Sequence, residues 1–113
     1  LTAKITDAGQ FQVYVGLFKK TGKKKSKRIA LNTLQIDDGN GDYRIRLYDT
    51  DIITAKGNKM ILSSGNQQTD TTKKRINANL PKGYYIMQKA FDWYLQTPDK
   101  KEIEFVDGMA IDL

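Results

Sequence analysis

The residues with the clearest chemical potential are cations concentrated in one short segment. Residues 19–28 read KKTGKKKSKR and contain no acidic side chain. Such a segment suits phosphates, because each phosphate that a cation neutralises releases condensed counterions. A solvated hairpin tip, or a lysine-rich edge that prevents strand association, has the same composition. We favour phosphate binding, since this much charge exceeds what solubility requires. The candidate contacts are Lys19, Lys20, Lys23, Lys24, Lys25, Lys27 and Arg28.

The charge of the remaining chain indicates that the basicity belongs to this one segment. The 113 residues carry 19 Lys and Arg against 13 Asp and Glu, for a net charge of +6. Outside residues 19–28 there are 12 cations and 13 acids, so the rest of the protein is close to neutral. We therefore expect a polyanionic partner, either RNA or single-stranded DNA, bound with low sequence preference.

A second group of candidate contacts lies on a predicted strand at 43–48. Arg44 and Arg46 share its exposed face with Tyr48, because alternate residues of a strand point the same way. Arginines beside an aromatic ring suit single-stranded nucleic acid, whose bases stack on rings while cations follow the backbone. The alternative is a half-buried Tyr48 and arginines that pair with nearby acids, namely Asp42, Asp49 or Asp51.

A third group lies in the first half of a helix predicted over 70–80. Lys73, Lys74 and Arg75 follow one another there, where the helix dipole disfavours positive charge. A bound anion would relieve that cost. Lys73 and Arg75 are therefore candidate phosphate contacts, and a solvated helix face is the alternative.

Composition excludes most catalytic chemistry. The chain has no histidine and no cysteine, which removes imidazole acid–base catalysis, thiolate nucleophiles and the usual zinc sites. Asp49 and Asp51 could share a face of a strand, and residues 37–42 crowd three aspartates into a turn. That turn lacks the spacing and closing glutamate of a calcium loop. We expect no enzyme activity, no catalytic residue, no bound metal and no cofactor.

The first third of the chain predicts a hairpin that carries the lysine-rich segment. Residues 11–18 (FQVYVGLF) read as a strand with two apolar faces, which indicates a central strand or a subunit contact. Residues 29–36 read as its partner with a slip near Asn32-Thr33, and residues 19–28 would form the loop between them. The polar run at 37–42 predicts a turn.

The stretch from Tyr43 to Gly65 predicts a strongly bent hairpin. The strand at 43–48 loses its alternation at residues 49–51, where a bulge or sharp bend would exchange the two faces. Gly57-Asn58 then predicts a turn, because both residues tolerate positive φ. Residues 60–62 return as the partner strand.

The last third predicts the helix and further strands. Thr69 or Asp70 is the expected N-cap of the helix at 70–80, which Pro81 and Gly83 would end. Residues 84–95 read as a long strand or a bent pair of strands. Residues 101–106 would close a hairpin with them, and Asp107-Gly108 would turn the chain into a short strand at 109–111.

These elements predict one small β domain over residues 1–113. We expect a bent antiparallel β-barrel or roll with one short α-helix. No apolar run is long enough to span a membrane. A competing function is that of a structural or assembly protein, in which the apolar strand 11–18 forms contacts between copies in a homo-oligomer.

The part of the chain between Tyr43 and Tyr94 resembles a group of small phage-encoded proteins of unassigned function. The resemblance is carried by Thr50-Asp51-Ile52-Ile53-Thr54, Ser64-Gly65, Thr69, Thr71 to Asn77, Leu80-Pro81, Gln88-Lys89 and Trp93-Tyr94. It implies a marine phage or cyanophage origin and action in the host cytoplasm. Phage proteins of this size with bent hairpins can resemble Sm-like or SH3-like barrels, which assemble as rings and bind RNA; that step is an analogy of fold. With a phage origin, the competing structural role is that of a phage structural or assembly protein.

Overall fold

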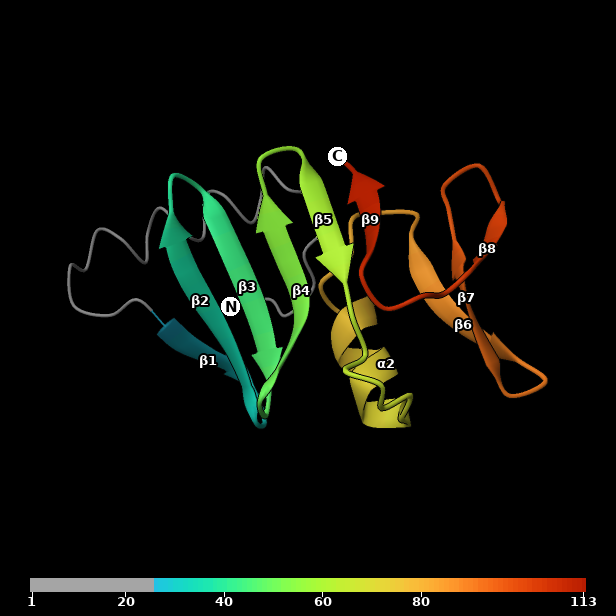
Figure 1. The fold of residues 1–113 in the computed structure, drawn as a ribbon, viewed down its shortest axis with the longest axis horizontal. Helices are drawn as coiled ribbons and strands as arrows, with labels where there is room; N and C mark the ends of the chain where they lie inside the picture. The colour runs from blue at the N-terminus through green and yellow to red at the C-terminus, as the bar shows by residue number, and fades with distance from the viewer. Residues whose placement is uncertain (1–25) are drawn as a thin grey trace.

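The computed structural model of the protein describes residues 26–113, which form two antiparallel sheets and one helix (Figure 1). The larger sheet has the strand order β1-β2-β3-β4-β5-β9 and the smaller one the order β6-β7-β8. The larger sheet contains β1 (Ser26–Ala30), β2 (Thr33–Gly39), β3 (Asp42–Leu47), β4 (Thr50–Lys56), β5 (Lys59–Leu62) and β9 (Met109–Asp112). The remaining elements are helix α2 (Asp70–Asn77), β6 (Tyr85–Lys89), β7 (Asp92–Gln96) and β8 (Glu102–Glu104).

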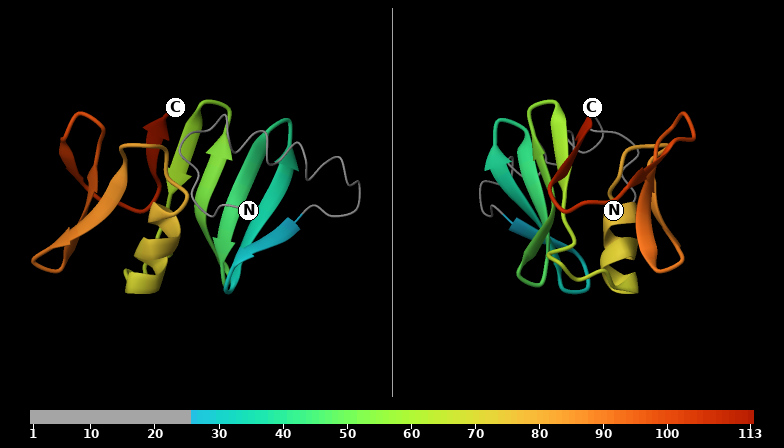
Figure 2. Two further views of the ribbon diagram at one scale, coloured as in Figure 1. Left: turned by 180° about the vertical axis from the view of Figure 1, so that it is seen from behind. Right: turned by 45° about the vertical axis from the view of Figure 1, so that its right-hand side comes forward.

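The two sheets lie in different layers. In Figure 2 the larger sheet forms one layer, while α2 and the smaller sheet stand beside it as the other. Tyr43 and Ile45 of β3 point into the space between the layers and are fully or almost fully buried, as is Ile76 of α2. Trp93 of the smaller sheet packs edge to face against Phe105 in the same core, with ring centroids 5.4 Å apart. Burial of this apolar surface is the main force that holds the layers together.

The predicted class, mainly β with one short helix, is confirmed. The predicted barrel is not seen, because the strands of residues 26–113 form two open sheets and neither closes on itself. The predicted N-cap is confirmed, since the Thr69 side chain accepts a hydrogen bond from the Thr72 N–H. The helix ends at Asn77, three residues before its predicted end. The strand predicted at 11–18 and the lysines at 19–25 lie outside the described residues.

Three segments for which the sequence predicted a slip, a bend, and either one long strand or a bent pair are in fact hairpins with two-residue turns. The segment 29–36 divides into β1 and β2 around Leu31-Asn32, so Lys27 and Arg28 belong to a strand and not to a loop. The bend predicted at 49–51 is the turn Tyr48-Asp49 between β3 and β4. The segment 84–95 divides into β6 and β7 around Ala90-Phe91. The turn predicted at 37–42 is shorter than expected, because β2 extends to Gly39.

The apolar–polar alternation of β3 is lost after residue 48 for two reasons. One is the turn between β3 and β4, and the other is a β-bulge in β4. Ile45 pairs with Ile53 and Arg46 pairs with Asp51, so Ile52 is an extra residue on β4. A bulge turns two successive side chains towards the same side. Ile52 and Ile53 are consequently both fully buried.

The connection from β5 to α2 passes close to the β3–β4 turn, and Gly65 permits this approach. Gly65 has φ +63°, and a Cβ at this position would lie 2.7 Å from the side chain of Thr50. Gly57 has nearly the same φ, +59°, but open space around it. A substitution at Gly57 therefore measures only the free-energy cost of positive φ. A substitution at Gly65 measures that cost together with the cost of the close contact with Thr50.

We expect Gly57→Ala to destabilise the protein by about 1 kcal/mol, the cost of positive φ for an L-residue. Gly65→Ala should cost about 2–4 kcal/mol, because overpacking against Thr50 adds to that strain. Urea unfolding of both variants measures the difference. Equal losses in the two variants would contradict the tight contact.

Asp107 fixes the same connection from the other side. Its Oδ1 accepts hydrogen bonds from the N–H (2.7 Å) and hydroxyl (2.8 Å) of Ser64, and its Oδ2 accepts one from the Asn66 N–H (2.9 Å). Partial burial disfavours the charged carboxylate, but these hydrogen bonds outweigh it and hold the pKa of Asp107 below its ordinary value of 3.8. The charge therefore stabilises the fold above that value, and the stabilisation is lost as the pH falls through the lower folded-state pKa.

We expect Asp107→Asn to lower the free energy of unfolding by about 1–2 kcal/mol at neutral pH, because an amide nitrogen cannot accept from Asn66. The gap between wild type and variant should be constant above about pH 5 and shrink below about pH 4. Urea unfolding at several pH values tests this. A gap that does not change with pH would mean that the carboxylate charge contributes nothing.

Candidate nucleic-acid interface

The candidate interface is the end of the larger sheet where the β1–β2 and β3–β4 turns lie side by side, at the lower edge of Figure 1. The Tyr48 N–H donates to the Asn32 carbonyl (2.9 Å), and Asn32 Nδ2 donates to the Tyr48 hydroxyl (2.9 Å). Two hydrogen bonds thus join the turns and fix the direction of the Tyr48 ring. The ring is nevertheless 67% exposed.

Tyr48 and Asn32 both have positive φ, +52° and +54°. Two-residue hairpin turns need such a residue and normally take Gly, Asn or Asp there. Asparagine tolerates this conformation, but a bulky side chain such as tyrosine is an outlier. The local fold would therefore be better served by another residue at position 48.

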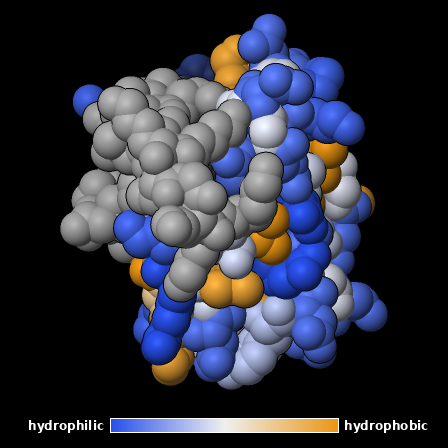
Figure 3. Space-filling model, turned by 90° about the vertical axis from the view of Figure 1, so that its left-hand side faces the viewer, coloured by the Kyte–Doolittle hydropathy of each residue, from blue (hydrophilic) through white to orange (hydrophobic). Residues whose placement is uncertain are grey.

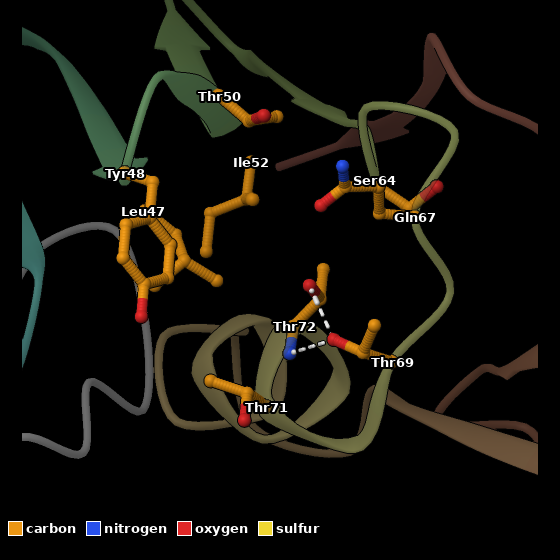
Figure 4. Close-up of a pocket in the computed structure, with 9 residues that line it drawn as sticks. All are labelled: Leu47, Tyr48, Thr50, Ile52, Ser64, Gln67, Thr69, Thr71 and Thr72. Atoms are coloured by element: carbon orange, nitrogen blue, oxygen red, sulfur yellow. Dashed lines mark hydrogen bonds between the residues drawn. The ribbon is translucent and has the colours of Figure 1, made fainter.

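Two hollows flank Tyr48. The first, of about 410 Å³, lies between the two turns and is lined by Arg28, Leu31, Asn32, Thr33, Leu34 and Tyr48. The second, of about 260 Å³, is lined by Leu47, Tyr48, Thr50, Ile52, Ser64, Gln67, Thr69, Thr71 and Thr72. Figure 4 shows Leu47 and Tyr48 on one side of the second hollow, Ser64 and Gln67 opposite them, and the threonines of the start of α2 along another side.

The hollows differ in chemistry. The second is lined by hydroxyls, of which Thr69 Oγ1 is already engaged by the N–H (3.2 Å) and hydroxyl (3.0 Å) of Thr72. The first contains a cation, Arg28, on the exposed part of β1. Arg28 Nε donates to the Ala30 carbonyl at 3.3 Å. Leu31 and Leu34 add exposed apolar surface to this hollow.

Arg44 and Arg46 form an ion-pair network on the outer face of the larger sheet. Arg44 Nε lies 2.8 Å from Asp38 and its Nη1 lies 3.3 Å from Asp51. Arg46 Nε lies 2.7 Å from the same Asp51. The hydrogen bond from Arg46, and then that from Arg44, hold the pKa of Asp51 below its ordinary value. The pairing with Asp51 that the sequence offered as an alternative is therefore present, and Asp38 joins it.

The cations of α2 also have partners. Lys73 Nζ lies 3.7 Å from Asp70 and 3.3 Å from the Gln88 side-chain oxygen. Arg75 Nε donates to Thr33 Oγ1 at 3.0 Å and so ties the helix to β2. Thr33 is one of the residues that line the first hollow, but Arg75 itself is not among them.

The structure thus brings together two of the predicted contacts, Arg28 and Tyr48, at one end of the sheet, while Arg75 contacts Thr33 and does not line the hollow. Arg44, Arg46 and Lys73 are held in polar contacts of their own, and Lys27 lies exposed on β1. Lys19, Lys20, Lys23, Lys24 and Lys25 lie outside the described residues.

Leu31 and Asn32 belong to this interface, but no motif in the sequence singles them out. The one signal that could have found them is Asn32 itself, because asparagine is a frequent residue at positive φ. The sequence indicated only a slip near Asn32-Thr33, and the structure places a complete chain reversal at Leu31-Asn32.

The described surface around the interface is mixed. Figure 3, which faces the β1 side, shows a largely hydrophilic surface with small separate hydrophobic patches. Within residues 26–113 no three acidic side chains converge in a way that could hold a metal ion. No helix in the described part of the chain is long and apolar enough to cross a membrane.

The comparisons with known proteins concern the family. No curated protein and no solved structure matches the chain. The family described as the Kyanoviridae Gp96 protein matches residues 18–112, which is most of the sequence. This confirms the phage resemblance found between Tyr43 and Tyr94 and extends it to the whole lysine-rich segment. The chain belongs to the Kyanoviridae Gp96 family of cyanophage proteins.

Proposed function

We propose that this phage protein binds RNA or single-stranded DNA with low sequence preference, through the cations of residues 19–28. The observation that carries the proposal is the place of Arg28. It is the last cation of the lysine-rich segment, and it lines the same hollow as the exposed ring of Tyr48. One cation of this segment and an accessible ring therefore adjoin, which is a combination that suits single-stranded nucleic acids. The expected place of action is the host cytoplasm.

The positions of the acidic residues distinguish cations that pair within the protein from cations that are candidates for binding phosphate. Arg44 and Arg46 already share Asp38 and Asp51, and a phosphate would have to compete with these carboxylates. Residues 19–28 contain no acid at all. We therefore assign most of the affinity to this segment and a minor share to Arg44, Arg46, Lys73 and Arg75.

The proposed function requires no catalytic step. Neither histidine nor cysteine is present anywhere in the sequence. Asp51, one of the two carboxylates considered for catalysis, neutralises two arginines. We propose a binding protein without enzyme activity or cofactor.

A structural or assembly role is the second candidate, and open sheet edges favour it. Among the described residues β8 pairs only with β7, and β9 pairs only with β5. An unpaired strand edge can accept a strand from another copy. An Sm-like ring, proposed from the sequence by analogy, would need such edge-to-edge contacts between subunits. The strand 11–18, proposed as a contact, lies outside the described residues.

The first experiment measures affinity for a fluorescent single-stranded oligonucleotide at several salt concentrations. If all seven cations contact phosphates, a plot of the logarithm of the association constant against the logarithm of the salt concentration should have a slope of about −5. The triple variant Lys23→Gln, Lys24→Gln, Lys25→Gln should bind more weakly, with a slope smaller by about 2.

The matched control is Lys56→Gln, Lys82→Gln, Lys100→Gln, which removes the same charge from three exposed positions elsewhere. It should change affinity and slope much less. Equal effects of the two triple variants would mean that net charge, and not the lysine-rich segment, determines binding.

The second experiment measures the mass of the particle by light scattering at low and high salt, with and without the oligonucleotide. A structural protein should form the same oligomer under all four conditions, because apolar and backbone contacts are little affected by salt. A monomer that associates only on nucleic acid would argue against the structural role.

A further inference from the structure

We propose that Tyr48 is a stacking platform for one unpaired base, so that the protein prefers single strands to duplexes of equal charge. The inference rests on the proposed nucleic-acid binding and adds selectivity to it. It starts from the conformation of Tyr48, whose φ of +52° is unfavourable for a bulky side chain. Strained residues that are kept at exposed positions often serve a function.

The ring is exposed and at the same time fixed in direction. Its hydroxyl accepts a hydrogen bond from Asn32 Nδ2, and the Tyr48 N–H donates to the Asn32 carbonyl. Both contacts are 2.9 Å long. A ring held in this way loses little conformational freedom when a ligand stacks on it, which favours binding.

The surroundings of the ring fit one nucleotide. The hollow of about 410 Å³ beside Tyr48 offers the apolar side chains of Leu31 and Leu34 and the guanidinium of Arg28. A base could stack on the ring and contact the leucines, while Arg28 contacts its phosphate. A paired base is already stacked on both faces inside a duplex, so only an unpaired base can enter.

Phe91 provides an internal comparison. It is 89% exposed and lies at φ +74° in the β6–β7 turn, so it shares the strain and the exposure of Tyr48. Its ring has no hydroxyl through which a neighbour could fix it. The cation next to that turn, Lys89, is engaged by Glu102 at 2.6 Å. Exposure and strain alone thus do not make a nucleotide site, and Phe91 serves as the matched control.

The test compares Tyr48→Gly with wild type on a single-stranded 20-mer of thymidine and on a duplex of the same length. We expect Tyr48→Gly to bind the single strand about 10-fold more weakly, the scale of one lost base stack. Duplex affinity should not change, and the salt slope should stay the same because stacking releases no counterions. Glycine accepts positive φ, so thermal stability should be equal or higher.

Three further variants make the result decisive. Phe91→Gly should leave both affinities within about 2-fold of wild type, because it removes an equally exposed ring elsewhere. Tyr48→Phe keeps the ring but removes its hydrogen bond to Asn32, so its single-strand affinity should lie between those of wild type and Tyr48→Gly. If Tyr48→Gly does not fold, Tyr48→Asn removes the ring with a residue that tolerates positive φ.

Each outcome has a defined meaning. Equal loss on single strand and duplex, or no loss on either, overturns the stacking platform while the proposed function stands. Loss of single-strand binding in Phe91→Gly as well would point to a nonspecific effect of exposed rings and also overturns it. A wild-type protein that binds neither oligonucleotide overturns the proposed function and this inference together.

Discussion

A two-residue connection between antiparallel strands forces at least one residue to positive φ, and the fold depends on meeting this constraint repeatedly. Gly57 meets it between β4 and β5, and Asn40-Gly41 meet it between β2 and β3. The other short hairpins use Asn32, Tyr48, and the pair Ala90-Phe91. Strands β1 to β5 follow one another in the sheet as they do in the chain, so each turn fixes the register of its neighbours.

The same constraint explains which elements could be predicted from the sequence. Gly57-Asn58 was recognised as a turn, because glycine and asparagine mark such turns. Tyr48-Asp49 and Ala90-Phe91 were not, since an aromatic residue at a hairpin tip resembles the interior of a strand. The start of the helix was recognised from its N-cap, Thr69, which is a local signal. The arrangement of the two sheets could not be predicted from the sequence, because it depends on contacts between residues that are far apart in the chain.

The same limit applied to the candidate site: its local features were predictable from the sequence, but its long-range contacts were not. The arginines of β3 were placed on one exposed face correctly, yet one partner, Asp38, comes from the preceding strand and is reached only through the register of β2 on β3. The neighbourhood of Arg28 and Tyr48 could not be predicted, because it requires that the chain reverse at Leu31-Asn32. Once that turn exists, residues 20 positions apart in the sequence line one hollow.

The distribution of charge and of exposed rings separates affinity from selectivity. Six cations of the described chain lie in ion pairs with its own acids. The lysine-rich segment has no acid of its own, and we propose it as the main contact for a polyanion. Such contacts do not distinguish one strand from two, because a duplex presents phosphates as well. An exposed ring does distinguish them, since stacking requires an unpaired base. If the proposed binding holds, the unfavourable φ of Tyr48 is a cost to folding that is offset by the recognition of single strands.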